Sequence, residues 1–166
     1  MKRFFKILFY TLLIALLLFQ FYPKPAKNIS VSINANDISL AHHVPADVQQ
    51  VLKTSCYDCH SNNTVYPWYC KIQPVALWLG NHIDDGKDEL NFSEFGSYSI
   101  RRKYRKLEEI NKEVKEGEMP LSSYTIIHRY AKLDEIKKLL VANWVAALRD
   151  SIKANYPADS LARTKR

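Results

Sequence analysis

The sequence predicts an all-α protein in which one small helical domain follows an N-terminal transmembrane helix. Apolar residues recur at three- and four-residue steps over residues 100–114 and again over 136–148, which is the period of a helix with one buried face. Residues 7–22 form instead an apolar run that only Thr11 and Gln20 interrupt. A chain of 166 residues is long enough for one domain beside such a segment and too short for two large cores.

The start of the chain has the features of an export signal. Lys2, Arg3 and Lys6 precede the apolar run, whose length lies between the roughly 7 to 15 residues of a signal-peptide core and the roughly 17 to 25 of a spanning helix. No small-x-small cleavage site follows. We therefore expect residues 1–22 to be an uncleaved signal anchor in the inner membrane, with the rest of the chain on the periplasmic side. Export followed by removal of the signal is the alternative.

The net charge of +7 is concentrated near the N-terminus. Lys2, Arg3, Lys6, Lys24 and Lys27 supply five of these charges before the first acidic residue, which leaves +2 for the rest of the chain. Acidic and basic residues are interleaved beyond that point. The charge therefore indicates membrane orientation, and we expect no nucleic-acid partner.

Residues 23–44 lack a helical apolar pattern and are predicted to be a tether. The segment starts with Pro23 and Pro25 and is then rich in Asn and Ser, a composition typical of extended, solvated chain. Such a tether would hold the helical domain away from the lipid surface.

The motif Cys-x-x-Cys-His lies at residues 56–60 and is the sequence at which haem is attached covalently in c-type cytochromes. Two thiols on one short turn can each add to a vinyl group of the haem, and the adjacent imidazole can bind the iron from one side of the ring. The motif predicts one haem c, with its iron, held through Cys56 and Cys59, and His60 as the proximal ligand.

Two other chemistries use a Cys-x-x-Cys pair. A dithiol oxidoreductase would place the pair at the start of a helix after a strand, and no strand is predicted before Cys56. A structural zinc site would combine Cys56 and Cys59 with two further ligands, and Cys70 and His82 could supply them at spacings unlike the usual second pair. If haem occupies the motif, Cys70 is a single thiol that we expect to be a small buried residue.

A short helix and an aromatic loop are predicted on either side of the motif. Asp47 can cap a helix whose apolar residues recur at helical spacing and which leads into Cys56. The loop that follows the motif, residues 61–69, ends with Trp68 and Tyr69. These two side chains would wall an edge of the haem, and packing into an ordinary core is the alternative.

Two longer helices are predicted after that loop. Pro74 suits the first turn of the earlier helix, which carries His82 near its end and is stopped by Gly86. The later helix covers about residues 100–116, with one apolar face and charged residues on its other faces, and Gly117 is its natural stop.

Met119 is the second candidate iron ligand. It follows the later helix in a loop stiffened by Pro120, and Met with His is a standard axial pair for haem. Core filling is the usual role of a methionine. His82 and His128 are alternative distal ligands, and an open distal position is a further alternative.

The last predicted helix covers about residues 135–154. Asp134 can cap it, and its apolar residues recur at helical spacing along one face. This helix completes a predicted domain at residues 45–154 and leaves residues 155–166 as a frayed basic tail.

Taken in order, these residues resemble those of a known family. The stretch from about residue 44 to residue 148 is similar to the haem-binding domains of Bacteroidetes-type mono-haem c-type cytochromes. The matching positions, besides the motif itself, are Ser61, Tyr66, Pro67, Trp68, Tyr69, Ile72, Pro74, His82, Leu90, Asn91, Phe92, Ser93, Met119, Pro120, Tyr124, His128 and Trp144. The resemblance implies a small cytochrome c-like helical domain around one haem, anchored and periplasmic, with a Met-Pro loop that supplies the distal ligand.

Two functions are compatible with these features. In an electron carrier, His60 and Met119 would fill both axial positions of an iron that changes between two oxidation states. In an enzyme or sensor, the distal position would be open or exchangeable and would admit peroxide or a small gas, with His82 as a candidate acid or base. The single haem motif and Met119 favour the carrier over an enzyme, and a carrier implies partner redox proteins of unknown identity.

Overall fold

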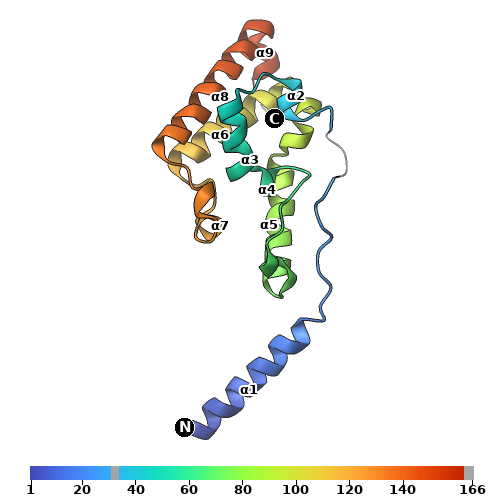
Figure 1. The fold of residues 1–166 in the computed structure, drawn as a ribbon. Helices are drawn as coiled ribbons and strands as arrows, with labels where there is room; N and C mark the ends of the chain where they lie inside the picture. The colour runs from blue at the N-terminus through green and yellow to red at the C-terminus, as the bar shows by residue number, and fades with distance from the viewer. Residues whose placement is uncertain (31–33, 163–166) are drawn as a thin grey trace.

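The computed structural model describes residues 1–30 and 34–162 and consists of helices joined by turns and loops (Figure 1). Within those two ranges no β-strand forms, and a single isolated antiparallel bridge joins Ile29 to Asn63. The all-α class is therefore confirmed. The predicted tether includes residues 31–33 and the predicted tail includes residues 163–166, which lie outside the described residues.

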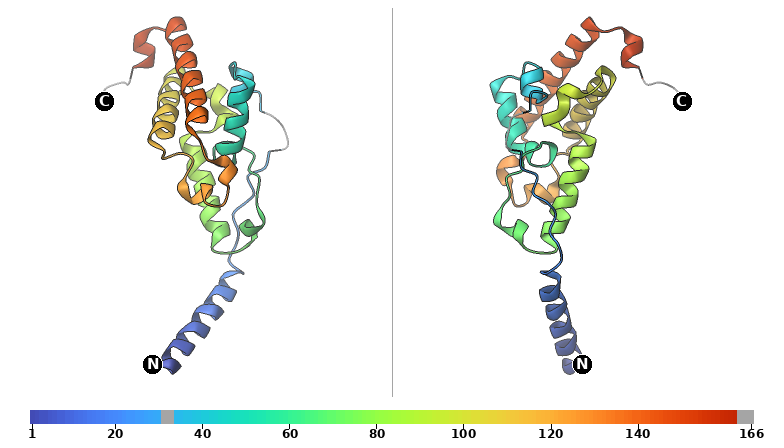
Figure 2. Two further views of the ribbon diagram at one scale, coloured as in Figure 1. Left: turned by 60° about the vertical axis from the view of Figure 1, so that its left-hand side comes forward. Right: turned by 90° about the vertical axis from the view of Figure 1, so that its right-hand side faces the viewer.

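Long helices alternate with short helical turns along the chain. The α-helices are α1 (Lys2–Phe19), α2 (Ile38–Ala41), α3 (Ala46–Ser55), α4 (Tyr57–His60), α5 (Val75–Glu89), α6 (Ile100–Glu116), α7 (Ser122–Thr125), α8 (Glu135–Asn155) and α9 (Ala158–Leu161). The 3-10 helices are η1 (Trp68–Lys71), η2 (Phe92–Ser97) and η3 (Arg129–Ala131). Figure 2 shows from two further sides that α1 projects away from the other helices.

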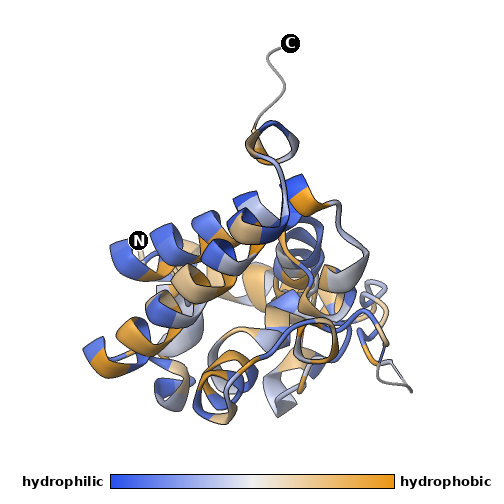
Figure 3. Ribbon diagram, turned by 90° about the horizontal axis from the view of Figure 1, so that it is seen from above, coloured by the Kyte–Doolittle hydropathy of each residue, from blue (hydrophilic) through white to orange (hydrophobic). Residues whose placement is uncertain are grey.

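The core lies where α3, α6 and α8 pack together. Leu52 of α3, Leu107 of α6 and Val141 and Val145 of α8 are each at most 1 % exposed. The apolar faces predicted for residues 100–116 and the last helix thus face each other, and the outer sides of these two helices are largely hydrophilic (Figure 3). Burial of each such side chain contributes roughly 1.5 to 3 kcal/mol.

Helix α6 has the predicted bounds, and both ends are capped. The Ser99 hydroxyl accepts a hydrogen bond from the backbone N–H of Arg102 at 3.3 Å. Gly117 adopts a left-handed conformation with φ of 78°, and the N–H groups of Glu118 and Met119 donate to the Glu113 carbonyl at 3.0 and 3.2 Å. A glycine is favoured there because a Cβ strains this conformation. Met119 therefore leaves the helix at a defined place.

The end of the chain differs from the predicted frayed tail. Helix α8 is capped by Asp134, whose carboxylate accepts from the Lys137 N–H at 2.9 Å, and it extends to Asn155. Pro157 then precedes the short helix α9, which packs against α6 and places Leu161 on the core. Pro157 suits the start of a helix, and Leu161 buries apolar surface against the core, so these two residues account for helix α9.

The transmembrane anchor predicted at residues 1–22 is wrong. Within residues 1–30 and 34–162, no helix combines the length and the apolarity needed to cross a membrane. Helix α1 ends at Phe19 and begins with Lys2, Arg3 and Lys6, so its apolar part rises only about 20 Å, against about 30 Å for a hydrocarbon core. The prediction that this helix anchors the domain on the periplasmic side of the inner membrane is therefore wrong as well.

The predicted tether packs on the domain. The Asn28 side-chain amide donates to the Ser61 carbonyl at 2.8 Å and to the Thr64 hydroxyl at 2.9 Å. Ile38 of α2 is completely buried in the core. Asn28, a residue type that suggested a solvated linker, instead donates hydrogen bonds to polar groups in the loop after the Cys-x-x-Cys-His motif.

Candidate functional site

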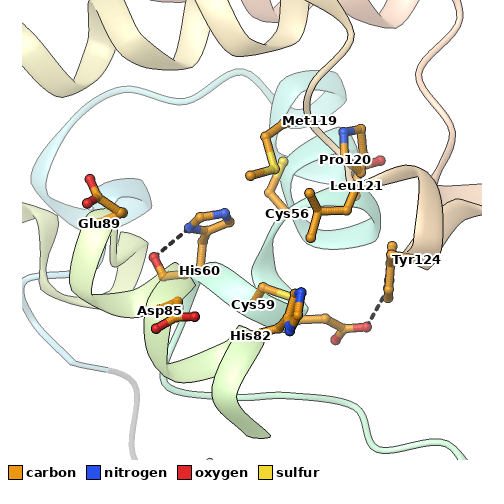
Figure 4. A pocket seen from close by; sticks show the side chains of 13 residues that line it. Cys56, Cys59, His60, His82, Asp85, Glu89, Met119, Pro120, Leu121 and Tyr124 are labelled. Atoms are coloured by element: carbon orange, nitrogen blue, oxygen red, sulfur yellow. Dashed lines mark hydrogen bonds between the residues drawn. The ribbon is translucent and has the colours of Figure 1, made fainter. Parts of the chain in front are cut away.

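Cys56, Cys59 and His60 lie on one turn and line one pocket. Helix α3 ends just before Cys56, and the N–H groups of Cys59 and His60 donate to the Cys56 carbonyl at 3.2 and 3.0 Å. The pocket has a volume of about 190 Å³, and Figure 4 shows that α5 and the chain after α6 supply its other labelled residues. The turn therefore presents both thiols and the imidazole to the same space.

The two middle residues of the motif fasten this turn to the fold. The Tyr57 ring stacks on Phe92 with 5.3 Å between ring centroids. The Asp58 carboxylate accepts from the Val65 N–H at 3.0 Å and from the Tyr124 hydroxyl at 2.6 Å. The motif Cys-x-x-Cys-His assigns no role to these two middle positions, and the sequence alone did not reveal their roles because their partners are distant in the chain.

His60 is held in the form that a metal ligand needs. Its Nδ1 lies 2.8 Å from the Gly86 carbonyl oxygen and 3.0 Å from that of Leu90. Carbonyl oxygens only accept, so Nδ1 carries the proton and Nε2 keeps its lone pair. Burial lowers the pKa of His60, which also favours the neutral imidazole.

Gly86 was predicted to stop α5, but it lies inside the helix, which extends to Glu89. A Cβ at this position would lie 2.7 Å from the carbonyl oxygen of Cys59, closer than real Cβ contacts allow. The glycine therefore lets α5 approach the motif turn and offers its own carbonyl to His60. A glycine inside a helical pattern is the available sequence signal for such a close approach.

Met119 reaches the same pocket from the chain that follows α6. It lines this pocket together with Cys56 and His60, and the same three residues line a second, adjoining cavity of about 310 Å³. Ile110 and Val114 of α6 contribute apolar walls to that second cavity. An apolar space bounded by two thiols, one imidazole and one thioether fits a flat, apolar, iron-containing group.

Lys106 is a buried charge beside this space. It is only 5 % exposed and lines the second cavity, with its Nζ 2.8 Å from Glu89 and 2.6 Å from Glu109. The two carboxylates compensate a charge that would otherwise be costly to bury. The sequence pattern placed Lys106 on a solvated face, because nothing in its spacing distinguishes it from its exposed neighbours.

The structure brings only some of the other candidate residues to the pocket. His82 lines it, with Nδ1 2.9 Å from the Trp78 carbonyl, which leaves Nε2 available. Trp68, Tyr69 and His128 line neither cavity. Trp68 is 74 % exposed, while His128 is buried and bonded to the Tyr69 hydroxyl.

The thiols do not have the properties of a redox dithiol. Burial raises the pKa of Cys56 to about 12 and that of Cys59 to about 11, whereas dithiol oxidoreductases lower a thiol pKa. The candidate zinc ligands are not arranged around one metal position either, although Cys56, Cys59 and His82 line the same pocket. In the described part of the chain, no group of three or more His, Cys, Asp or Glu side chains could hold a metal ion. Cys70 is half-buried beside Lys24 and Pro25, at a separate depression.

Fold and site together define a class: an all-α domain whose Cys-x-x-Cys-His turn and a nearby methionine enclose an apolar cavity. The chain belongs to the family of haem-binding domains, whose sequence model matches residues 14–147. No curated protein and no solved structure matches it. The protein is therefore a haem-binding protein, and the resemblance inferred from the motifs is confirmed at the level of this family.

Proposed function

We propose that the protein is an electron carrier, a mono-haem c-type cytochrome with His60 and Met119 as the axial ligands. The observation that supports this proposal is the shared pocket: Cys56, Cys59, His60 and Met119 all line it. Haem bound there would supply an iron that changes between two oxidation states.

The residues of the turn would attach and orient the haem. Each thiol would add across one vinyl double bond, so that a carbon–sulfur bond forms and the thiol proton goes to the neighbouring vinyl carbon. His60 would bind through Nε2, while the Gly86 and Leu90 carbonyls fix its ring and increase its basicity.

Met119 favours electron transfer over substrate chemistry. A thioether in the second axial position leaves no open site for peroxide or a gas. The alternative, an enzyme or sensor with an exchangeable distal position, is favoured by a different observation, since His82 lines the same pocket with Nε2 available.

Covalent attachment is tested on the protein produced together with a haem-attachment machinery. We expect a haem stain that survives denaturing electrophoresis and a thiol-alkylating reagent that labels Cys70 alone, because thioether sulfurs do not alkylate. Cys70 serves as the internal control, since it lies outside the pocket. A colourless protein with three alkylated cysteines contradicts the proposal.

Replacement of Met119 by alanine tests the distal ligand. The wild-type protein is expected to show a low-spin absorption spectrum with a sulfur-to-iron charge-transfer band, and Met119→Ala is expected to lose this band completely. His82→Ala is the matched control from the opposite wall of the pocket and should retain it. A high-spin wild-type spectrum with turnover of hydrogen peroxide would favour the enzyme instead.

A further inference from the structure

The chain segment that carries Met119 is connected to the Cys-x-x-Cys-His turn by one short hydrogen bond. We define the Met119 loop as residues 117–128, which join α6 to η3 and include α7. The Tyr124 hydroxyl of this loop donates to the Asp58 carboxylate at 2.6 Å (Figure 4). Tyr124 also lines the pocket with Met119 and Cys59. The bond therefore joins two walls of the haem site.

The Met119 loop has few other connections to the half of the domain that holds the motif. The backbone N–H groups of Glu118 and Met119 bond to Glu113 of α6, and those from Tyr124 onward bond within the loop. Besides the Tyr124 contact, the hydrogen bond between His128 and the Tyr69 hydroxyl reaches the first half of the domain. Among the described residues, the hydrogen bonds that connect the loop to the first half of the domain are thus made by side chains.

The phenol of Tyr124 is fixed in the orientation that this bond requires. Its ring stacks on the imidazole of His128, with 4.3 Å between centroids and 14° between planes. His128 is buried and also bonds to the Tyr130 hydroxyl at 2.8 Å. Burial and the neighbouring Asp58 raise the pKa of Tyr124, so the phenol keeps its proton and donates it.

We propose that Tyr124 is a positioning residue that holds the Met119 loop closed over the haem pocket through Asp58. This inference rests on the proposed function, because Met119 must be an iron ligand for the loop to control access to the iron. If the bond were broken, the loop could move away from the turn, and Met119 would no longer be held where it could bind the iron, so an external ligand could take its place.

The test measures how fast imidazole replaces the distal ligand in the haem-loaded protein. Tyr124→Phe removes the hydroxyl and keeps the ring on His128. We expect imidazole binding to accelerate about 10-fold to 100-fold, because a hydrogen bond to a charged acceptor contributes a free energy that corresponds to about this factor. Asp58→Asn, with a neutral acceptor, should give a smaller acceleration in the same direction. The double variant should be no faster than Tyr124→Phe, since both changes act on one bond.

Tyr104→Phe is the matched control. Tyr104 lies on α6, where its ring contacts the Arg149 and Lys153 cations of α8, and it does not line either cavity. The imidazole binding rate of this variant should equal that of the wild type. Equal rates in the wild type, Tyr124→Phe and Asp58→Asn would overturn the proposal.

A second measurement separates this inference from the ligand assignment. Amide hydrogen exchange of residues 121–128 should accelerate in Tyr124→Phe by a similar factor, whichever residue binds the iron. If Met119→Ala keeps the charge-transfer band, the assignment of Met119 as the ligand fails, while amide exchange of the Met119 loop still reports whether Tyr124 holds the loop closed. If the band is lost in Met119→Ala but amide exchange and imidazole binding do not change in Tyr124→Phe, only the role of Tyr124 in holding the loop fails.

Discussion

Gly86→Ala is expected to lower the free energy of unfolding by about 1 to 3 kcal/mol and to release His60 from its fixed orientation. The added Cβ would lie 2.7 Å from the Cys59 carbonyl oxygen and 3.3 Å from the Cys59 carbonyl carbon. These are backbone atoms, which cannot rotate aside as a flexible side chain can, so α5 must move away from the turn. The carbonyls of Gly86 and Leu90 would then lose contact with Nδ1 of His60.

If His60 is the proximal ligand, as proposed, the consequence for haem binding is large, because loss of the outer hydrogen-bond partner of a metal-ligating histidine typically costs about 10-fold to 100-fold in metal affinity. Denaturant unfolding of the haem-free protein measures the stability change, and the haem absorption spectrum measures the loss of His60 ligation. We expect a mixture of spectra in which part of the haem lacks its proximal ligand.

Gly80→Ala provides the matched control on the same helix. Both changes replace a helical glycine by alanine and share the gain in helix propensity of about 1 kcal/mol. A Cβ on Gly80 would meet Cγ of Pro25 at 2.5 Å, outside the haem pocket. We expect Gly80→Ala to displace this proline and to keep the wild-type haem spectrum. Equal spectra and equal stabilities of the two variants would refute the role of Gly86.

Phe92→Ala is expected to lower the free energy of unfolding by about 3 to 5 kcal/mol. The ring is 1 % exposed, stacks on Tyr57 and meets the edge of His60 with 6.4 Å between centroids. Its removal would leave a cavity directly behind the Cys-x-x-Cys-His turn. We therefore expect the haem content after purification to fall together with the stability, as measured by denaturant unfolding and by haem absorbance per protein.

Phe95→Ala tests whether the loss of haem follows from stability alone. Phe95 belongs to the same short helix, η2, and is completely buried, and its ring contacts those of His42 and Tyr98, whereas the Phe92 ring contacts those of Tyr57 and His60. A similar loss of stability with a higher haem content in Phe95→Ala would show that Phe92 positions the turn. Equal haem contents in the two variants would contradict that role.

The features that the sequence predicted well depend on interactions between near neighbours. The bounds of α6 follow from an apolar period, a serine cap and Gly117 in the left-handed conformation, all within a few residues of the helix. The predicted anchor failed for an equally local reason. Its apolar run was counted through residue 22, whereas the helix ends at Phe19 and three of its first residues are basic.

The features that the sequence did not predict depend on contacts between distant segments. Asparagine and proline in residues 23–44 are typical of a linker, and only the packing of Asn28 and Ile38 on the domain showed otherwise. Lys106 has the same local pattern as its exposed neighbours, and its burial depends on Glu89 of another helix.

By itself the sequence determined the helical class and the Cys-x-x-Cys-His motif of a haem-binding domain, because helix periodicity and thiol spacing act over a few consecutive residues. Only the tertiary structure decided how that motif is held. His60 finds its carbonyl partners 26 and 30 residues along the chain, and Asp58 finds Tyr124 at a separation of 66 residues. Such pairs form when α5 and the Met119 loop pack against the turn, and packing depends on the shapes of whole helices, which no short stretch of sequence contains.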